Sequence, residues 1–184
     1  MELKERDNVN KTADGRQWFV VYTRARAEKK VYADLCSLGI EAYLPLRKAL
    51  HQWKDRKKMV EVPLIGSYVF VKLKSNERDT VFRCNHIVRY ITFEGKPVAV
   101  PEKQMVSLRS LVESDIDIEA VVESIRPGEH VKIVFGPLAG ITGEFVSLES
   151  EKRFLLRINK IGYSLIAKIP AAWVEKEEEV GSKK

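Results

Sequence analysis

Hydrophobic positions along the chain alternate between short β-like runs and one-sided helical repeats. Order is expected to begin at Gln17, where the run WFVVYT is β-branched and aromatic, as is typical of a buried strand. Thr23 is a candidate N-cap for the helix that follows, and Gly39 is expected to end this helix. The apolar positions between them fall on one helical face at Ala27, Val31, Leu35 and Leu38.

The same alternation continues through the first 112 residues. Further strands are predicted at residues 40–46, 61–73 and 86–93, and further helices at 75–85 and 101–112. This order is that of a split βαβ unit of ferredoxin-like type, an α+β fold in which helices pack on one face of an antiparallel sheet. The other face is then expected to be free to meet water or a partner.

The remainder of the chain predicts a second, smaller unit. Residues 113–125 are acidic and are expected to be a linker or a weakly held extension. Residues 126–176 contain four or five β-like runs at roughly ten-residue spacing, the pattern of a small β-barrel. Residues 1–15 are expected to be a flexible lead-in, and residues 177–184 a charged tail.

Three glycines gather in the stretch VKIVFGPLAGITG at residues 131–143. Gly136, Gly140 and Gly143 are predicted turn residues, because the strands of so small a barrel must bend sharply. A phosphate-binding loop would need a following helix and a terminal GK[ST], and the stretch has neither.

Charge is unevenly distributed along the chain. The 184 residues carry a net charge of +6, and residues 16–60 hold eleven Lys and Arg against four Asp and Glu. This surplus suggests an anionic partner, although it could equally serve solubility. No apolar run approaches 18 residues and the N-terminus has no hydrophobic signal region, so a cytoplasmic location is expected.

Candidate catalytic and metal-ligating residues are sparse. Cys36 and Cys84 are far apart and form no CxxC pair, so both are expected to be buried thiols and not zinc ligands. The three histidines, His51, His86 and His130, stand at no recognisable spacing from a Ser, a Cys or paired carboxylates. We therefore expect no enzymatic activity, no metal and no cofactor.

The basic segment at residues 47–59 predicts a charged hairpin projecting from the sheet, because it shows no apolar periodicity. Its indole, Trp53, could stack on an unpaired base. Six cations could contact DNA phosphates: Arg47, Lys48, Lys54, Arg56, Lys57 and Lys58. The alternative interpretation is a solvated surface loop.

Two stretches together resemble a known family. VKIVFGPLAGITGEFVSL resembles a KOW motif, and WFVVYTRARAEKKV with IGSYVFVKL resembles the N-terminal domain of NusG-type transcription elongation factors. The resemblance covers about residues 16–175 and implies an N-terminal NGN domain at 16–112 and a KOW domain, an SH3-like barrel, at 126–176. It implies a monomeric, non-enzymatic factor that binds elongating RNA polymerase and suppresses pausing or termination.

The resemblance also implies the interface residues. An apolar depression that receives the clamp helices of the largest polymerase subunit corresponds to Tyr22, Tyr68, Phe70 and Tyr90. Tyr68 and Phe70, two apart on a strand, share a face, although Phe70 and Tyr22 could equally be core. Asn76 and Thr80 correspond to a second polymerase contact, and Arg24 to a contact with non-template or upstream DNA.

Departures from the general family pattern suggest a specialised paralogue. Ile65, Gly66 and Ser67 stand where general factors commonly carry Phe-Pro-Gly. Ile161 replaces the aromatic residue of the KOW partner loop, and Tyr163 follows after one glycine, so the partner of this loop stays open. The pattern is similar to that of paralogues serving surface-polysaccharide operons.

The alternative function is that of a KOW-containing ribosome-associated or RNA-binding protein. Residues 126–175 hold seven Lys and Arg against five acids, which is too balanced for an RNA-clamping surface. Some specialised relatives refold this domain from helices to a barrel. Here the density of Val, Ile, Phe and Gly favours the barrel throughout.

Overall fold

The computed structural model describes residues 14–52, 57–114, 116–122, 127–148, 151–158 and 160–177. Three predicted DNA-binding residues, Trp53, Lys54 and Arg56, lie outside this part of the chain, as do most of the predicted lead-in and tail. Contacts divide the described residues into two compact units. The first runs to Arg109 and includes Lys160 and Ile161, and the second contains the other described residues from Ser110 onwards.

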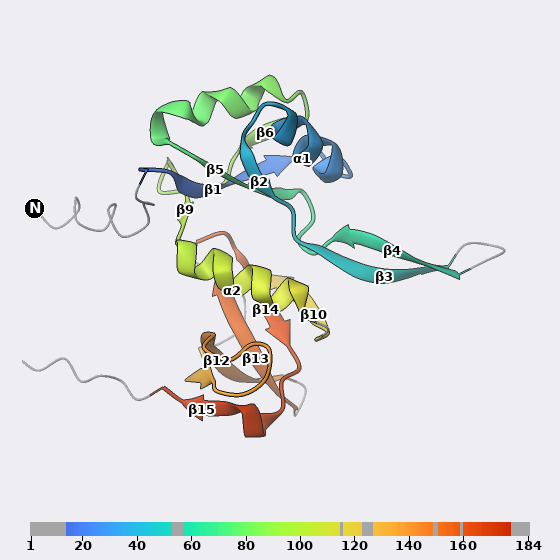
Figure 1. The fold of residues 1–184 in the computed structure, drawn as a ribbon, viewed down its shortest axis with the longest axis vertical. Coiled ribbons are helices and arrows are strands. Elements are labelled where there is room, and N and C mark those ends of the chain that lie inside the picture. Colours follow the sequence, from blue (N-terminus) through green and yellow to red (C-terminus); the bar gives the residue numbers. More distant parts are fainter. Residues whose placement is uncertain are drawn as a thin grey trace, which may run out of the picture. The chain divides into compact units, whose positions relative to one another are not determined.

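The first unit is built on an antiparallel sheet with the strand order β2-β5-β1-β6, and β9 also pairs with β1 (Figure 1). These strands are β1 (Gln17–Thr23), β2 (Glu41–Tyr43), β5 (Tyr68–Leu73), β6 (Ile87–Tyr90) and β9 (Ala99–Val100). The helices are α1 (Glu28–Ser37), the 3-10 helix η1 (Ser75–Arg83) and α2 (Glu102–Glu113). A short hairpin, β7 (Thr92–Phe93) with β8 (Lys96–Pro97), follows β6. The α+β prediction is confirmed.

The main core of this unit lies on one face of the sheet. Alternate residues of β1, Phe19 and Val21, are buried there together with Val31 and Leu35 of α1. The sequence period therefore identified Val31 and Leu35 correctly as the buried side of α1. Leu38, predicted on the same face, instead follows the end of the helix and is 44% exposed.

The start of α1 differs from the prediction. The helix begins at Glu28 with Ala27 as its N-cap, whereas the Thr23 hydroxyl donates a hydrogen bond to the carbonyl oxygen of Arg24. The carboxylate of Glu28 instead accepts a 2.7 Å hydrogen bond from the backbone N–H of Ser67. At the other end Gly39 has φ +74°, as expected of a residue that terminates a helix.

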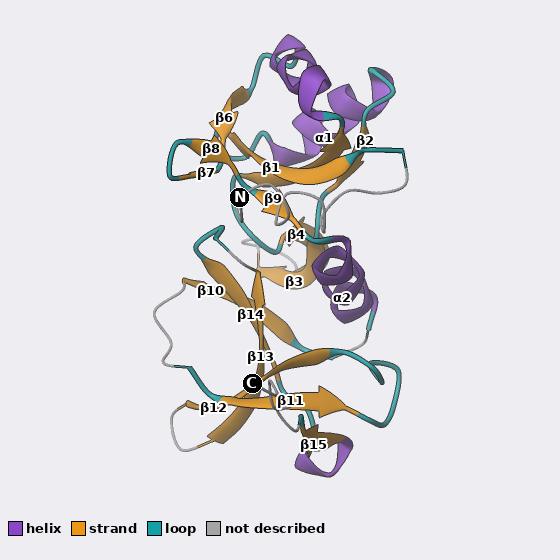
Figure 2. Cartoon of the chain, turned by 90° about the vertical axis from the view of Figure 1, so that its left-hand side faces the viewer, coloured by secondary structure: helices purple, strands orange, loops and turns teal. Residues whose placement is uncertain are grey.

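Helix α2 contacts the opposite face of the sheet, which corrects the prediction that all helices share one face (Figure 2). The indole N–H of Trp18 donates a 2.9 Å hydrogen bond to Glu102. The guanidinium of Arg109 lies 4.9 Å from the Trp18 ring centre and 5.1 Å from that of Tyr43. The Trp18 end of the second face is therefore occupied by α2.

The basic segment forms a hairpin, as predicted. Strands β3 (Leu46–Gln52) and β4 (Lys57–Pro63) pair with each other in a two-stranded sheet of their own. At their base, the N–H of Leu64 donates a 2.8 Å hydrogen bond to the carbonyl oxygen of Pro45. Figure 1 shows the two strands extending away from the main sheet of this unit.

The second unit is a six-stranded antiparallel sheet with the order β10-β14-β13-β12-β11-β15, a β domain of the predicted KOW type. Its strands are β10 (Ile118–Val122), β11 (Glu129–Ile133), β12 (Thr142–Leu148), β13 (Glu151–Ile158), β14 (Tyr163–Ala167) and β15 (Val174–Lys176), with the 3-10 helix η2 (Ala171–Trp173) before β15.

The segment predicted as an acidic linker contributes β10 to this sheet. Its alternation of apolar and acidic residues is that of a half-buried strand, and Ile118, paired with Ala167 of β14, is 6% exposed. The sequence predicted a linker because the segment is acidic and its apolar residues are small, with no aromatic among them. The second unit therefore begins earlier than predicted.

Two of the three predicted turn glycines adopt the left-handed conformation, Gly136 with φ +78° and Gly140 with φ +94°. Gly143 lies inside β12, and a β-carbon there would come within 2.5 Å of the Phe154 ring. Its role is close packing and not a turn. Both cysteines were predicted to be buried. The prediction is confirmed for Cys84 and wrong for Cys36, which is exposed.

Candidate functional site

Two predicted interface residues, Tyr22 of β1 and Tyr68 of β5, lie opposite each other in the sheet register. Their ring centres are 5.9 Å apart with an edge-to-face tilt of 78°. Tyr22 is half-buried and Tyr68 is 8% exposed. The Tyr68 hydroxyl donates a 3.2 Å hydrogen bond to the carbonyl oxygen of Ile161, which belongs to the same unit.

Phe70 shares the face of Tyr68 but is fully buried. Its ring centre lies 6.4 Å from that of Tyr43. The alternative that Phe70 is a core residue is therefore correct. It lies on the same face as the more exposed Tyr22 and Tyr68.

Tyr90 lies on the opposite face of the sheet, which corrects the expectation that the four aromatic rings form one surface. It pairs with Val21, its ring packs edge-on against Phe19, and its hydroxyl donates a 2.8 Å hydrogen bond to the carbonyl oxygen of Arg78. Burial raises the pKa of this hydroxyl, although the charge of Arg78 opposes the shift. Tyr90 is a core residue under η1.

Arg89 occupies the position on the tyrosine face that was expected for Tyr90. It pairs with Tyr22 in the sheet register, and its guanidinium lies 5.3 Å from the centre of the Tyr22 ring. The sequence offered one signal for this residue, an arginine placed one position before a β tyrosine. We define the tyrosine face as Tyr22, Tyr68 and Arg89.

Arg24, a predicted DNA contact, is exposed immediately after β1. Its backbone N–H donates a 2.9 Å hydrogen bond to the carbonyl oxygen of His86, which fixes the chain where β1 ends. Arg26 is also exposed and has φ +63°, an uncommon conformation for a residue with a side chain. The end of β1 thus presents two cationic side chains on a well-defined backbone.

The described cations of the hairpin are all exposed: Arg47, Lys48, Lys57 and Lys58. The only acid among the described hairpin residues is Glu61, which lies opposite Lys48. Exposed amines and a guanidinium on a narrow ribbon can contact successive phosphates of a nucleic acid. The hairpin therefore presents its described cations to solvent, and their contact with DNA stays a prediction.

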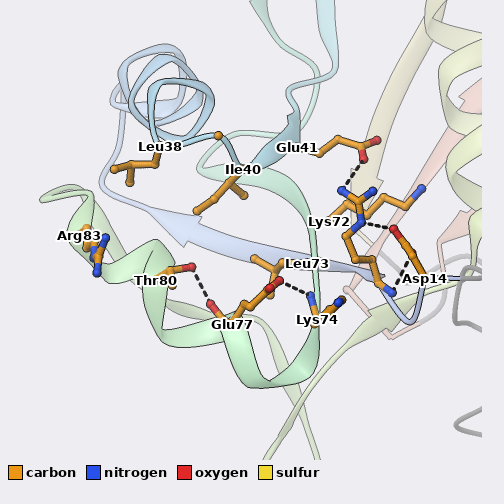
Figure 3. A pocket seen from close by; sticks show the side chains of 12 residues that line it. Asp14, Leu38, Ile40, Glu41, Lys72, Leu73, Lys74, Glu77, Thr80 and Arg83 are labelled. Atoms are coloured by element: carbon orange, nitrogen blue, oxygen red, sulfur yellow. Dashed lines mark hydrogen bonds and ion pairs between the residues drawn. The ribbon is translucent and has the colours of Figure 1, made fainter.

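Asn76 and Thr80, the weaker polymerase candidates, both lie on η1, and Asn76 is exposed. Thr80 is half-buried and borders a hollow of about 500 Å³ (Figure 3), and its hydroxyl donates a 2.6 Å hydrogen bond to the carbonyl oxygen of Glu77. The lining includes four cations and three acids, and Arg16 lies 3.8 Å from Glu41. This near balance selects no charged ligand.

The two residues of the predicted KOW partner loop belong to different units. Ile161 is 3% exposed and belongs to the first unit, whereas Tyr163 begins β14 of the second unit and is half-buried opposite Ile158.

In the described part of the chain, no three His, Cys, Asp or Glu side chains gather in a way that could hold a metal ion. None of the described helices has the length and apolar character needed to cross a membrane.

Comparisons with known proteins agree on one family. The family model described as "Transcription termination factor nusG" matches residues 16–109. The chain is 21% identical over 164 residues to the "Transcription termination/antitermination protein NusG" of Rickettsia felis, and 20% identical over 168 residues to that of Rickettsia conorii. These alignments cover 83% and 84% of this chain, and 83% and 88% of the relatives.

One solved structure shows the same fold. The structure titled "Domain interaction in Thermotoga maritima NusG" has a TM-score of 0.53 and 21% sequence identity. The match covers 91% of this chain and 100% of the other.

Proposed function

This chain belongs to the NusG family of transcription termination/antitermination factors, and from that premise we propose that it binds elongating RNA polymerase at the clamp helices and suppresses pausing or termination. The observation that carries the proposal is the tyrosine face, where two rings in cross-strand register lie beside a guanidinium. Large, stiff amphipathic rings and arginine are the residue types that dominate binding energy at protein interfaces.

The tyrosine face suits a helical partner that carries both apolar and acidic side chains. The Tyr22 ring offers apolar area at a half-buried position, and Arg89 offers charge directly beside it. Phe70, on the same face, is fully buried and packs against Tyr43. A preformed surface of this kind loses little conformational entropy when a partner binds.

The hairpin and the end of β1 would act on DNA in the same complex. Arg24, Arg47, Lys48, Lys57 and Lys58 are exposed cations that could contact phosphates of upstream or non-template DNA. A factor that holds polymerase and DNA together disfavours the open, paused state only to the extent that it binds the active state more tightly.

The test replaces both tyrosines. Tyr22→Ala with Tyr68→Ala is expected to weaken binding to bacterial RNA polymerase, and to its isolated clamp-helix segment, by about 30-fold, as for a central interface cluster. Tyr32→Ala is the matched control, because Tyr32 is 38% exposed on α1. Equal binding by the two variants in a quantitative pull-down would reject the tyrosine face as the docking surface.

A selective role at particular operons, such as surface-polysaccharide loci, is the finer part of the proposal. It is supported by Ile65, Gly66 and Ser67, which depart from the general family pattern. Transcription through a pause site should respond to the protein more strongly on a template carrying its own operon's leader than on an unrelated template. An equal response on both templates would indicate a general factor.

A further inference from the structure

The hairpin of β3 and β4 has two different faces. Residues directly opposite each other in an antiparallel pair share a face, and the pairs alternate between faces along the ribbon. Leu50 lies opposite Met59 on one face. The next pair, Ala49 with Val60, belongs to the other face and is half-buried.

Leu50 and Met59 form an exposed apolar pair. Leu50 is 59% exposed and Met59 is 55% exposed. The pairs that flank them on this face are Lys48 with Glu61 and Gln52 with Lys57. Two large apolar side chains side by side on a surface, bordered by charges, are a mark of a binding site.

We propose that this face of the hairpin enters the major groove of duplex DNA, with Leu50 and Met59 against the C5-methyl groups of thymines and with Lys48 and Lys57 on the flanking phosphates. The inference rests on the DNA contact of the proposed function. The inference adds the mode of DNA binding and two uncharged contact residues, Leu50 and Met59.

Shape supports this occupant. The major groove is about 12 Å wide and admits a two-stranded β-ribbon. β3 and β4 form such a ribbon, seven residues long on each strand, and they pair with no other described strand. Base edges in the groove present thymine methyl groups, which apolar side chains recognise.

Charge supports it as well. The described residues of this face include two exposed cations, Lys48 and Lys57, and one acid, Glu61. Arg47 and Lys58 add two exposed cations on the other face, so the described part of the ribbon is positive and favours a polyanion. Unpaired bases are bound mainly by flat aromatic rings, and neither Leu50 nor Met59 provides one. Duplex DNA is therefore favoured over a single strand.

The test measures binding of the full chain by fluorescence anisotropy to two duplexes of the same sequence, one with thymine and one with uracil. Uracil lacks only the C5-methyl group. The natural chain should bind the uracil duplex more weakly by about threefold for each methyl group contacted. Leu50→Ser with Met59→Ser should weaken binding to the thymine duplex and remove the difference between the two duplexes.

Two controls isolate the apolar pair. Val60→Ser introduces the same side chain on the opposite face and should keep the preference for thymine. Lys48→Gln with Lys57→Gln should flatten the dependence of log affinity on log salt by about 1 for each phosphate that is no longer neutralised. Equal binding of the natural chain to both duplexes, or a thymine preference that survives replacement of Leu50 and Met59, would overturn the inference.

A failure here is distinguishable from a failure of the proposed function. Leu50→Ser with Met59→Ser should still bind RNA polymerase, because these residues lie outside the tyrosine face. If the thymine preference is absent while Tyr22→Ala with Tyr68→Ala weakens polymerase binding as expected, only the groove inference fails. If the apolar pair instead binds a protein surface, the double serine variant will bind polymerase weakly and keep its DNA affinity.

Discussion

At the scale of single residues, Glu144 shows how the second unit stabilises a buried charge. Glu144 is 7% exposed on β12, accepts a 2.9 Å hydrogen bond from the N–H of Gly128, and pairs with Arg157 of β13 at 3.0 Å. Burial raises the pKa of Glu144, but the hydrogen bonds from Arg157 and Gly128 outweigh it, so the pKa lies below its usual value. The ionised form is favoured in the folded state.

A lowered carboxyl pKa gives stability that is present above the unfolded pKa and is lost as the pH falls through the folded pKa. The free energy of unfolding should therefore decrease as the pH falls below about 4, the usual range of glutamate. Arg157→Met should cost about 3 kcal/mol at pH 7, because it leaves a buried carboxylate without its partner. The cost should shrink at low pH, where Glu144 can bind a proton.

Urea denaturation of both proteins at pH 7 and near pH 4 measures this difference. Glu144→Gln with Arg157→Met is the control, since it removes both charges and should make the remaining destabilisation independent of pH. A cost of Arg157→Met that is the same at both pH values would mean that the pair contributes through packing and not through charge.

Residue identity could be predicted from the sequence better than residue orientation. Tyr22 and Tyr68 were recognisable as strand aromatics, but the face of Tyr90 depends on how β6 pairs with β1. Tyr22 pairs with Arg89 and Val21 pairs with Tyr90, so Arg89 lies on the face of Tyr22 and Tyr90 faces the core. A shift by one residue exchanges the two faces of a strand, and local sequence does not specify it.

At the scale of elements, the loop between β11 and β12 depends on one glycine. Gly136 has φ +78°, and a β-carbon there would lie 2.6 Å from the indole of Trp173. The N–H of Val134 donates a 2.8 Å hydrogen bond to the carbonyl oxygen of Trp173, which holds the indole over the loop. Gly140, in the same loop, also has positive φ but has nothing within 4 Å of a β-carbon.

Gly136→Ala is expected to destabilise the chain by about 2 to 3 kcal/mol, from backbone strain together with overpacking against Trp173. Gly140→Ala should cost only the backbone part, about 1 kcal/mol. Thermal unfolding of the two variants compares them directly. Adding Trp173→Ala should remove the difference between them, and a difference that persisted would place the cost of Gly136→Ala outside this contact.

Elements with strong periodicity could be predicted, and elements decided by tertiary contacts could not. The repeat through Val31 and Leu35 located α1 correctly. The face of the sheet that α2 covers depends on the contact between Arg109 of α2 and Trp18 of β1. These residues are 91 positions apart, so no local sequence pattern encodes the contact. The hairpin was predictable from its charges and its lack of apolar periodicity, but the pairing of the exposed Leu50 and Met59 depends on the register of β3 and β4.

At the scale of the whole molecule, the boundary of the second unit determines what a functional fragment must contain. The chain divides near Arg109, and β10 pairs with β14 over five residue pairs. A fragment of residues 110–177 contains all six strands of the sheet, whereas 127–177 lacks β10. β14 would then become an exposed edge strand with unpaired backbone groups.

We expect the fragment 110–177 to show the circular dichroism of a β protein and to melt at a higher temperature than 127–177. Within the longer fragment, Ile118→Ala should cost about 2 kcal/mol or more, because it removes a buried side chain and leaves the length unchanged. Glu119→Ala, at an exposed position of the same strand, is the matched control.

Equal melting temperatures for the two fragments would show that β10 is dispensable and would restore the interpretation of this segment as a linker. The fragment 110–177 retains four residues of α2. A helical circular dichroism signal larger than these four residues can give would contradict the prediction that the second unit is a β domain. The buried positions of β11 and β12, Val131, Ile133 and Val146 among them, alternate with a period of two, which a helix would scatter around its surface. A chain patterned in this way should keep its strands whether or not the first unit is attached.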